Sequence, residues 1–285
     1  MFEHTNSKPE DPDITPYAKL IRKLGETFVV RDVMVQLPQI EYVGPGDEAA
    51  ASRLVGEKRY SVVPVSDDGK TFNSVFCTVH EANDPRRITR EQQTSISDHI
   101  PDSTALADAF SLFDSREWYL TLRDNRVSGL ITYWAFNSRE FRVQLYAGLS
   151  RVEELSRDVL AMDGCGLIDE HGLTLTPTGL AKIKQRIGPS WLENGGNRFV
   201  DELDYHQVNA SLSKHPPWRS FLNEQIGLAF SNGGYDRPYN FTSLRDAVMH
   251  GRVLFPTYRE FKECTPLIRN IGRLIDLLGV YLART

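Results

Sequence analysis

The sequence predicts a chain of two parts, an α+β N-terminal region followed by an all-α helical bundle. The order helix, strand, turn, strand occurs twice between residues 29 and 138, which indicates an internal repeat. Most of residues 139–285 has the apolar spacing of amphipathic helices. A chain of 285 residues, 40% apolar and 25% charged, has room for two such globular domains. We expect domain limits at 1–28, 29–138 and 139–285.

The first 28 residues are expected to form an arm and a short helix. Residues 1–14 are polar, and Thr15-Pro16 is typical of a helix start. The N-terminus lacks the basic and apolar regions of a signal peptide, and no apolar stretch is long enough to span a membrane. Three scattered cysteines without C-x-x-C spacing argue against disulfides and zinc. We therefore expect a cytoplasmic protein without a membrane partner.

The repeat covers about residues 29–82 and 95–138. Asp47 and Asp102 precede the two expected helices and are 55 positions apart, while Thr78 and Thr132 end the last strands and are 54 apart. Equal spacing indicates two copies of one unit, each of which covers the apolar face of the other. The expected helices and strands are 48–55, 60–65 and 74–78 in the first copy, and 103–113, 118–122 and 127–132 in the second.

These units resemble a pair of CBS motifs. The resemblance depends on Val63-Pro64-Val65, on the Asp67-Asp68-Gly69 turn, and on Gly129-Leu130-Ile131-Thr132. It implies an α/β sandwich that binds an adenosine-containing ligand: AMP, ADP, ATP or S-adenosylmethionine.

The resemblance also implies where the ligand binds. Family members often have Ser/Thr-x-x-Asp after the last strand, with the Asp on the ribose hydroxyls. Here Thr78 is followed by Glu81, whereas Thr132 is followed by Ala135. We expect one ribonucleotide site near Glu81 and a degenerate second one; the alternative is a pair kept only for dimerisation. The ligand-binding candidates are Val63, Pro64, Thr78, Glu81 and Thr132.

The C-terminal part should contain several helices, at 139–162, from Pro177 on, and at about 197–213, 218–230, 240–250 and 257–283. The run from Gly166 to Leu175 is interpreted as a small hairpin that resembles the wing of winged-helix proteins. This leaves a DNA-binding regulator as an alternative, although no sequence matches the groove-entering helix that this motif requires.

The most informative stretch is Arg245-Asp246-Ala247-Val248-Met249-His250, followed by Gly251. Histidine exchanges a proton near neutral pH, and the planar guanidinium of Arg suits a phosphodiester. Five helical steps place Arg245 and His250 about 140° apart, whereas Asp246 and His250 share a face. Glycine at position 251 favours a helix end there. The plainer interpretation is an ordinary helix with a solvated His at its end.

The pattern Arg-polar-x-x-x-His late in a helical region resembles the HEPN family of small helical domains, many of them ribonucleases. The resemblance is good over residues 240–282 and loose over 139–285. It implies a metal-independent endoribonuclease whose composite cleft forms between the two chains of a homodimer. His250 would move the proton, Arg245 would stabilise phosphorane charge and Asp246 would orient His250. Such domains often serve toxin–antitoxin or phage-defence systems. The rival interpretation is a non-catalytic nucleotide sensor or adaptor that binds RNA or a protein.

Charge and motifs narrow the choice of partner and chemistry. The net charge is −5, but residues 236–285 hold eight Lys and Arg against five Asp and Glu, a net of +3 that favours a polyanion such as RNA. No phosphate-binding loop, H-E-x-x-H or G-x-S-x-G motif occurs. His206 and His215 lack accompanying metal-ligand spacing, and we interpret them as structural.

Overall fold

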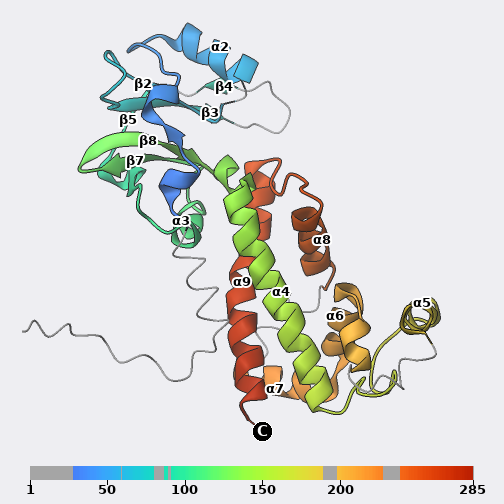
Figure 1. The fold of residues 1–285 in the computed structure, drawn as a ribbon. Helices are drawn as coiled ribbons and strands as arrows, with labels where there is room; N and C mark the ends of the chain where they lie inside the picture. The colour runs from blue at the N-terminus through green and yellow to red at the C-terminus, as the bar shows by residue number, and fades with distance from the viewer. Residues whose placement is uncertain are drawn as a thin grey trace, which may run out of the picture. The chain divides into compact units, whose positions relative to one another are not determined.

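A computed structural model describes residues 28–58, 60–79, 87–88, 91–188, 198–226 and 238–284. The chain divides into two compact units, Met1–Ala135 and Phe136–Thr285, whereas the sequence placed the boundary after residue 138. The short helix expected at 17–27 lies outside the described residues. Figure 1 shows the course of each unit.

The first unit contains two four-stranded sheets. In one, β2 (Val62–Val65) and β3 (Ser74–Val79) form an antiparallel hairpin, and β4 (Arg87–Ile88) and β5 (Gln92–Gln93) both pair with β3. In the other the order is β1-β8-β7-β6. Its strands are β1 (Val35–Gln36), β6 (His99–Pro101), β7 (Trp118–Arg123) and β8 (Arg126–Thr132).

The two repeats exchange their first strands. β1 precedes the first hairpin in sequence but pairs with β8 of the second repeat, and β5 precedes the second hairpin but pairs with β3 of the first. Each hairpin therefore gains an edge strand from another part of the unit, a pairing that the repeat spacing did not predict. The apolar core between the hairpins draws on both copies, with Ile40, Val62, Phe72, Val75, Trp118, Leu120 and Leu130.

One helix belongs to each repeat. Helix α2 (Glu48–Lys58) packs Ala51 and Val55 against Val63, Val65 and Phe76 of the first sheet. Helix α3 (Leu106–Leu112) precedes β7 in the second copy and buries Leu106, Ala109 and Phe110. The described residues also include short 3-10 helices: η1 (Val30–Asp32), η2 (Leu37–Gln39), η3 (Ile96–Asp98) and, across the boundary between the units, η4 (Tyr133–Asn137).

Every regular element among the described residues of the second unit is helical. The long helices α4 (Arg139–Met162) and α9 (Tyr258–Leu282) run side by side, and α6 (Tyr205–Lys214) and α8 (Pro238–Met249) pack against α4 (Figure 1). The others are α5 (Pro177–Ile187), η5 (Phe199–Glu202) and α7 (Pro216–Ile226).

Local sequence explains where the long helices begin. Ser138 caps α4 by accepting a hydrogen bond from the Phe141 N–H. Thr257 and Glu260 form a reciprocal capping box at the start of α9. Each of these pairs satisfies backbone N–H groups that have no partner inside the helix.

The hairpin expected between Gly166 and Leu175 is wrong. The segment contains no strand: a Gly166 N–H to His171 C=O bond of 2.8 Å and a Leu173 N–H to Glu170 C=O bond of 3.1 Å close it as a loop. The segment also bonds a distant part of the chain, because the Val200 N–H donates to the Gly166 carbonyl at 2.8 Å. The wing that suggested a DNA-binding regulator is therefore absent.

Candidate functional site

Helix α8 carries the motif and ends where its glycine predicted. Gly251 has φ of 63°, a left-handed conformation that glycine adopts without strain. The Arg252 N–H bonds the Ala247 carbonyl at 3.0 Å and the Gly251 N–H bonds the Val248 carbonyl at 3.3 Å, the two bonds of a Schellman ending. His250 is therefore the C-cap residue of α8, at the negative end of the helix dipole.

His250 and Asp246 both lie on the surface. The His250 backbone N–H bonds the Asp246 carbonyl at 3.0 Å, as in any helix. Within the described ranges, neither the imidazole nor the Asp246 carboxylate makes a side-chain hydrogen bond, to each other or to another group. The imidazole is thus open to solvent and ligands, and an orienting role for Asp246 stays a prediction.

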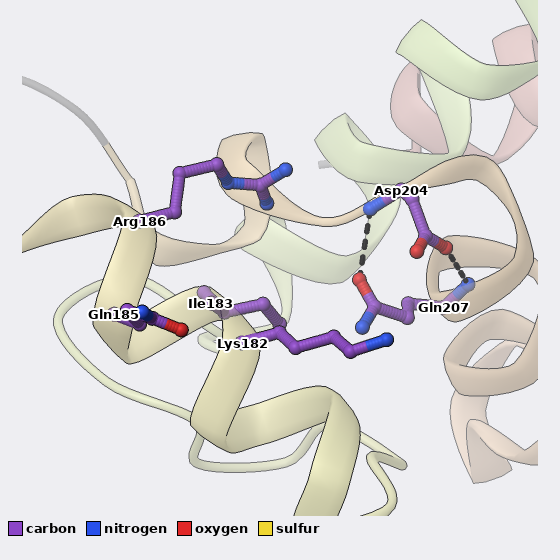
Figure 2. A pocket seen from close by; sticks show the side chains of 6 residues that line it. All are labelled: Lys182, Ile183, Gln185, Arg186, Asp204 and Gln207. Atoms are coloured by element: carbon purple, nitrogen blue, oxygen red, sulfur yellow. Dashed lines mark hydrogen bonds between the residues drawn. The ribbon is translucent and has the colours of Figure 1, made fainter.

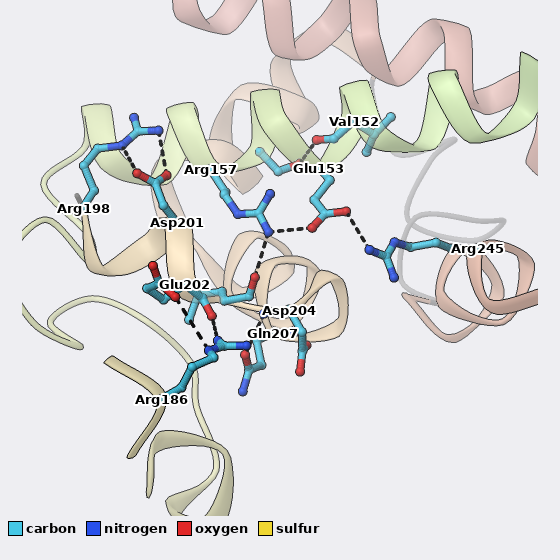
Figure 3. Close-up of polar contacts among 12 residues, drawn as sticks. Val152, Glu153, Arg157, Arg186, Arg198, Asp201, Glu202, Asp204, Gln207 and Arg245 are labelled. Carbon is cyan, nitrogen blue, oxygen red and sulfur yellow. Dashed lines mark hydrogen bonds and ion pairs between the residues drawn. The ribbon is translucent and has the colours of Figure 1, made fainter. Parts of the chain in front are cut away.

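Arg245 points to the interior of the bundle. Its guanidinium Nη2 lies 3.3 Å from Glu153 Oε2 of α4, and its Cζ lies 5.2 Å from the centre of the Tyr205 ring. The other oxygen of Glu153 accepts a bond of 2.5 Å from Arg157, whose Nη2 also donates to the Leu203 carbonyl at 2.7 Å. Figure 3 shows the Glu153 carboxylate between the two guanidinium groups.

This network is largely shielded from water. The side chains of Arg245, Glu153 and Arg157 are 27%, 12% and 18% exposed. Burial raises the pKa of Tyr205 to about 12, so its ring stays neutral beneath the Arg245 guanidinium. Within one chain, Arg245 therefore faces inward while His250 is exposed, in agreement with the separation that helix geometry predicts.

The structure adds Arg142, which the sequence reasoning missed. A methyl carbon built on Gly251 would lie 3.5 Å from Arg142 Nη1, so this guanidinium reaches the end of α8 from α4. Arg142 Nε is buried and, among the described residues, has no hydrogen-bond partner. No sequence signal separates Arg142 from the other charged residues of α4, because its proximity to Gly251 depends on how the two helices pack.

Asn137 holds the chain that follows His250 against the start of α4. Its Oδ1 accepts hydrogen bonds from the N–H groups of Leu254 at 2.7 Å and Phe255 at 2.9 Å, and its Nδ2 donates to the Phe255 carbonyl at 3.2 Å. The Phe255 ring packs edge-on to Phe261, with centroids 5.2 Å apart. The end of α8 is thus held by its own C-cap hydrogen bonds and by the Asn137 hydrogen bonds to the residues that follow it.

The nucleotide-site candidates lie at the strands expected for them. Val63 of β2 is fully buried under α2, so only its backbone could reach a ligand, and Pro64 is buried beside it. Thr78 is half-buried in β3 and donates its hydroxyl to the Tyr60 carbonyl at 2.7 Å. Thr132 ends β8 and is half-buried. Glu81, the expected ribose ligand, lies outside the described residues.

A cavity of about 330 Å³ lies between α5 and the start of α6. Asp204 and Gln207 line it but bond each other reciprocally, with both distances 2.9 Å, as the capping box of α6 (Figure 2). The cavity holds none of the residues that the sequence singled out. Its lining is Lys182, Ile183, Gln185, Arg186, Asp204 and Gln207.

The described ranges hold neither a membrane-spanning helix nor a cluster of metal-binding side chains. None of their helices combines the length and the apolar character needed to cross a bilayer. In the same ranges, His, Cys, Asp and Glu side chains do not gather in groups of three or more that could hold a metal ion.

Neither a protein-family model nor a curated protein sequence matches the chain. Three solved structures resemble it over 41–42% of its length, and all are CBS domains. The CBS domain of a bacterial CNNM/CorC family Mg²⁺ transporter in complex with ATP is 15% identical, with 94% of that chain covered and a TM-score of 0.32. A hemolysin-like protein containing a CBS domain, from Oenococcus oeni PSU, is 17% identical, with 93% covered and a TM-score of 0.30. The transporter domain bound to the inhibitor IGN95a is 16% identical, with 81% covered and a TM-score of 0.29. At these scores the likeness assigns neither a ligand nor an activity to this chain.

Proposed function

We propose that the chain is a metal-independent endoribonuclease of HEPN type, regulated by an adenine ribonucleotide that binds its N-terminal unit. The observation that carries the nuclease is His250: an exposed imidazole at a well-defined helix end, on the same helix as Arg245 and one residue before Gly251, which the Arg142 guanidinium reaches. A group that exchanges protons near neutral pH, next to a cation, is what RNA cleavage without a metal requires.

In this mechanism His250 takes the proton of the ribose 2′-hydroxyl or gives one to the departing 5′-oxygen. A guanidinium stabilises the charge that develops on the phosphorane. Arg142 is the candidate for this within one chain, because its Nη1 reaches the end of α8 next to Gly251. The products are a 2′,3′-cyclic phosphate and a 5′-hydroxyl.

A second copy of the chain supplies Arg245, since one helix cannot direct Arg245 and His250 to the same point. Each Arg245 then has to exchange its Glu153 contact for the substrate phosphate. When Arg245 leaves, Glu153 keeps its 2.5 Å ion pair with Arg157. The carboxylate is therefore not left unpaired, which limits the free-energy cost of the exchange. We propose that the active protein is a homodimer, and that it is a toxin or phage-defence effector whose activity the nucleotide-binding unit regulates.

The regulatory half of the proposal is supported by the exchanged strands β1 and β5, which make the two repeats one unit. The CBS domain of the bacterial CNNM/CorC family Mg²⁺ transporter is solved in complex with ATP. For this chain we infer one adenine ribonucleotide near Thr78, with its ribose hydroxyls on Glu81. The residue after Trp134 is Ala135, so the second repeat lacks the corresponding acid.

One observation favours a second candidate, a nucleotide sensor or adaptor that binds RNA or a protein without cutting. The Arg245 guanidinium is held by Glu153 and Tyr205 in a network that stabilises the bundle. An Arg kept in this position is structural, and His250 is then only a solvated helix cap.

The experiment is RNA cleavage by the purified homodimer in EDTA, with and without AMP, ADP, ATP or S-adenosylmethionine. We expect cleavage by the wild type, and loss of about 10²–10⁴-fold in His250→Ala, the usual contribution of a positioned general acid or base. His171→Ala is the matched control, because His171 is also exposed but lies on a loop away from α8. Cleavage that requires Mg²⁺, or that survives in His250→Ala, refutes this mechanism, whereas intact RNA under every condition leaves the sensor.

A further inference from the structure

Four polar side chains meet where three helices of the second unit end. Asp163 is the C-cap residue of α4, His215 is the C-cap residue of α6, and Tyr281 lies in the last turn of α9. Cys165 follows Asp163 by two positions. The proposed nuclease uses none of these groups.

Their hydrogen bonds define the protonation of the histidine. His215 Nε2 lies 2.6 Å from Asp163 Oδ2, and the Tyr281 hydroxyl donates to the same oxygen at 2.7 Å. A carboxylate only accepts hydrogen bonds, so Nε2 carries the proton of the neutral ring. The lone pair of Nδ1 then faces Cys165 Sγ, which lies 3.8 Å away, within reach of a sulfur hydrogen bond.

This is the order of groups that activates a nucleophile: an acid holds the imidazole in one tautomer, and the imidazole faces the thiol. The Asp163 carbonyl oxygen is at a similar distance from the sulfur, 3.9 Å, but only the imidazole can take up the thiol proton. Burial is the main cause that raises the pKa of the Cys165 thiol, and the charge of Asp163 raises it further. The thiol is therefore protonated before it reacts. Reaction therefore requires proton transfer to His215 as the sulfur attacks.

Access limits the size of the reactant. Cys165 and His215 are each 6% exposed. Gly172 covers the sulfur so closely that a methyl carbon built on it would lie 2.5 Å from Sγ, yet Gly172 itself is on the surface. The thiol thus lies one backbone layer below solvent, within reach of a molecule the size of water but not of a peptide or a bulky acyl donor.

We propose that Cys165, with His215 as its base and Asp163 as the group that orients and stabilises the imidazolium, is a modification site for small hydroperoxides. His215 Nδ1 takes the thiol proton, the sulfur attacks one peroxide oxygen, and the O–O bond breaks. The departing oxygen takes the proton from the imidazolium and leaves as an alcohol, or as water from hydrogen peroxide. The sulfur is oxidised to a sulfenic acid and the peroxide is reduced.

The test treats the full-length protein with hydrogen peroxide and dimedone, which labels sulfenic acids, and follows each cysteine by peptide mass spectrometry. Cys77 and Cys264 form no disulfide, and both are more exposed than Cys165. They are controls within the same molecule, because exposure alone predicts that they react first. We expect Cys165 to be labelled first.

Three variants separate activation from access. His215→Asn removes the base and should slow labelling of Cys165 about a hundredfold, with Cys77 and Cys264 unchanged. Asp163→Asn keeps an acceptor for the imidazole but removes the charge that stabilises the imidazolium, so it should also slow labelling, by about tenfold. Tyr281→Phe loosens the same junction while keeping acid, base and thiol, and labelling should be at least as fast as in the wild type.

The direction in which each variant changes the labelling rate of Cys165 distinguishes an activated thiol from a structural cluster. If the cluster is only a structural junction, each variant opens it and labelling of Cys165 rises in all three. A rise in all three variants overturns the proposal. So does a Cys165 that is labelled after Cys77 and Cys264, or a Tyr281→Phe variant in which labelling is as slow as in His215→Asn. Circular dichroism checks the fold of each variant, and Asp163→Asn decides alone if His215→Asn does not fold.

Discussion

Replacing Arg245 with alanine tests whether this residue stabilises the bundle. The change removes the 3.3 Å contact with Glu153 and the guanidinium 5.2 Å above the Tyr205 ring. Because Glu153 keeps Arg157, the lost pair should cost only about 1 kcal/mol, below the cost of leaving a buried charge alone. The cation–π contact adds about 1 kcal/mol. The free energy of unfolding should therefore fall by about 2 kcal/mol.

For a unit of this size, about 2 kcal/mol corresponds to a melting temperature roughly 4–8 °C lower. Circular dichroism during thermal unfolding, together with urea titration, measures both quantities. Arg245→Lys keeps a positive charge near Glu153 but loses the planar stacking, so its loss should be about half as large. Arg252→Ala is the control, because Arg252 is exposed. Its replacement should change the free energy of unfolding by less than about 0.5 kcal/mol. An Arg245→Ala protein as stable as the wild type would show that the network in Figure 3 does not hold Arg245 in solution.

Further predictions concern the nuclease site, the nucleotide site, alkaline stability and assembly. Arg142→Ala should lower RNA cleavage by about ten- to a hundredfold at unchanged melting temperature; full activity would remove Arg142 from the site. Glu81→Ala should weaken adenine-nucleotide binding by about ten- to a hundredfold in calorimetry, because charge-assisted bonds to the ribose are lost. A wild type that gives no heat with any of the four ligands would contradict regulation by a nucleotide. Between pH 10 and about 12 the unfolded chain loses the Tyr205 proton while the folded chain keeps it, so this residue should lower the free energy of unfolding by up to about 3 kcal/mol, and Tyr205→Phe should remove that part of the fall. Light scattering should give a dimer at micromolar concentration, whereas a monomer would exclude the composite site.

Elements with a strong local signal could be predicted from the sequence. Helix α4 has the predicted bounds because Ser138 caps it and one face is apolar over its whole length. The end of α8 could be predicted from Gly251, and the repeat in the first unit is visible in its spacing. The exchanged strands β1 and β5 could not be predicted, because a strand of two residues has no periodicity.

The arrangement of side chains depends on contacts between distant parts of the chain, and these explain what the sequence reasoning missed. Glu153 meets Arg245 only because α8 packs on α4. Cys165 and His215 are 50 positions apart, and Tyr281 is 118 from Asp163. We interpreted His215 as structural because its neighbours in sequence form no metal-ligand pattern, but its partners come from other helices. The loop from Gly166 to Leu175 has the composition of a hairpin, yet it bonds Val200 rather than closing on itself as strands.

The most direct test of the account is the chemistry of the RNA ends produced in EDTA by the wild type and by His250→Ala. A histidine-centred cleavage that activates the ribose 2′-hydroxyl must leave a 2′,3′-cyclic phosphate and a 5′-hydroxyl. We predict these ends for the wild type and no cleavage above background for His250→Ala. Cleavage that appears only with added Mg²⁺ and leaves a 3′-hydroxyl and a 5′-phosphate would contradict the account, as would intact RNA with the dimeric wild type under every nucleotide condition.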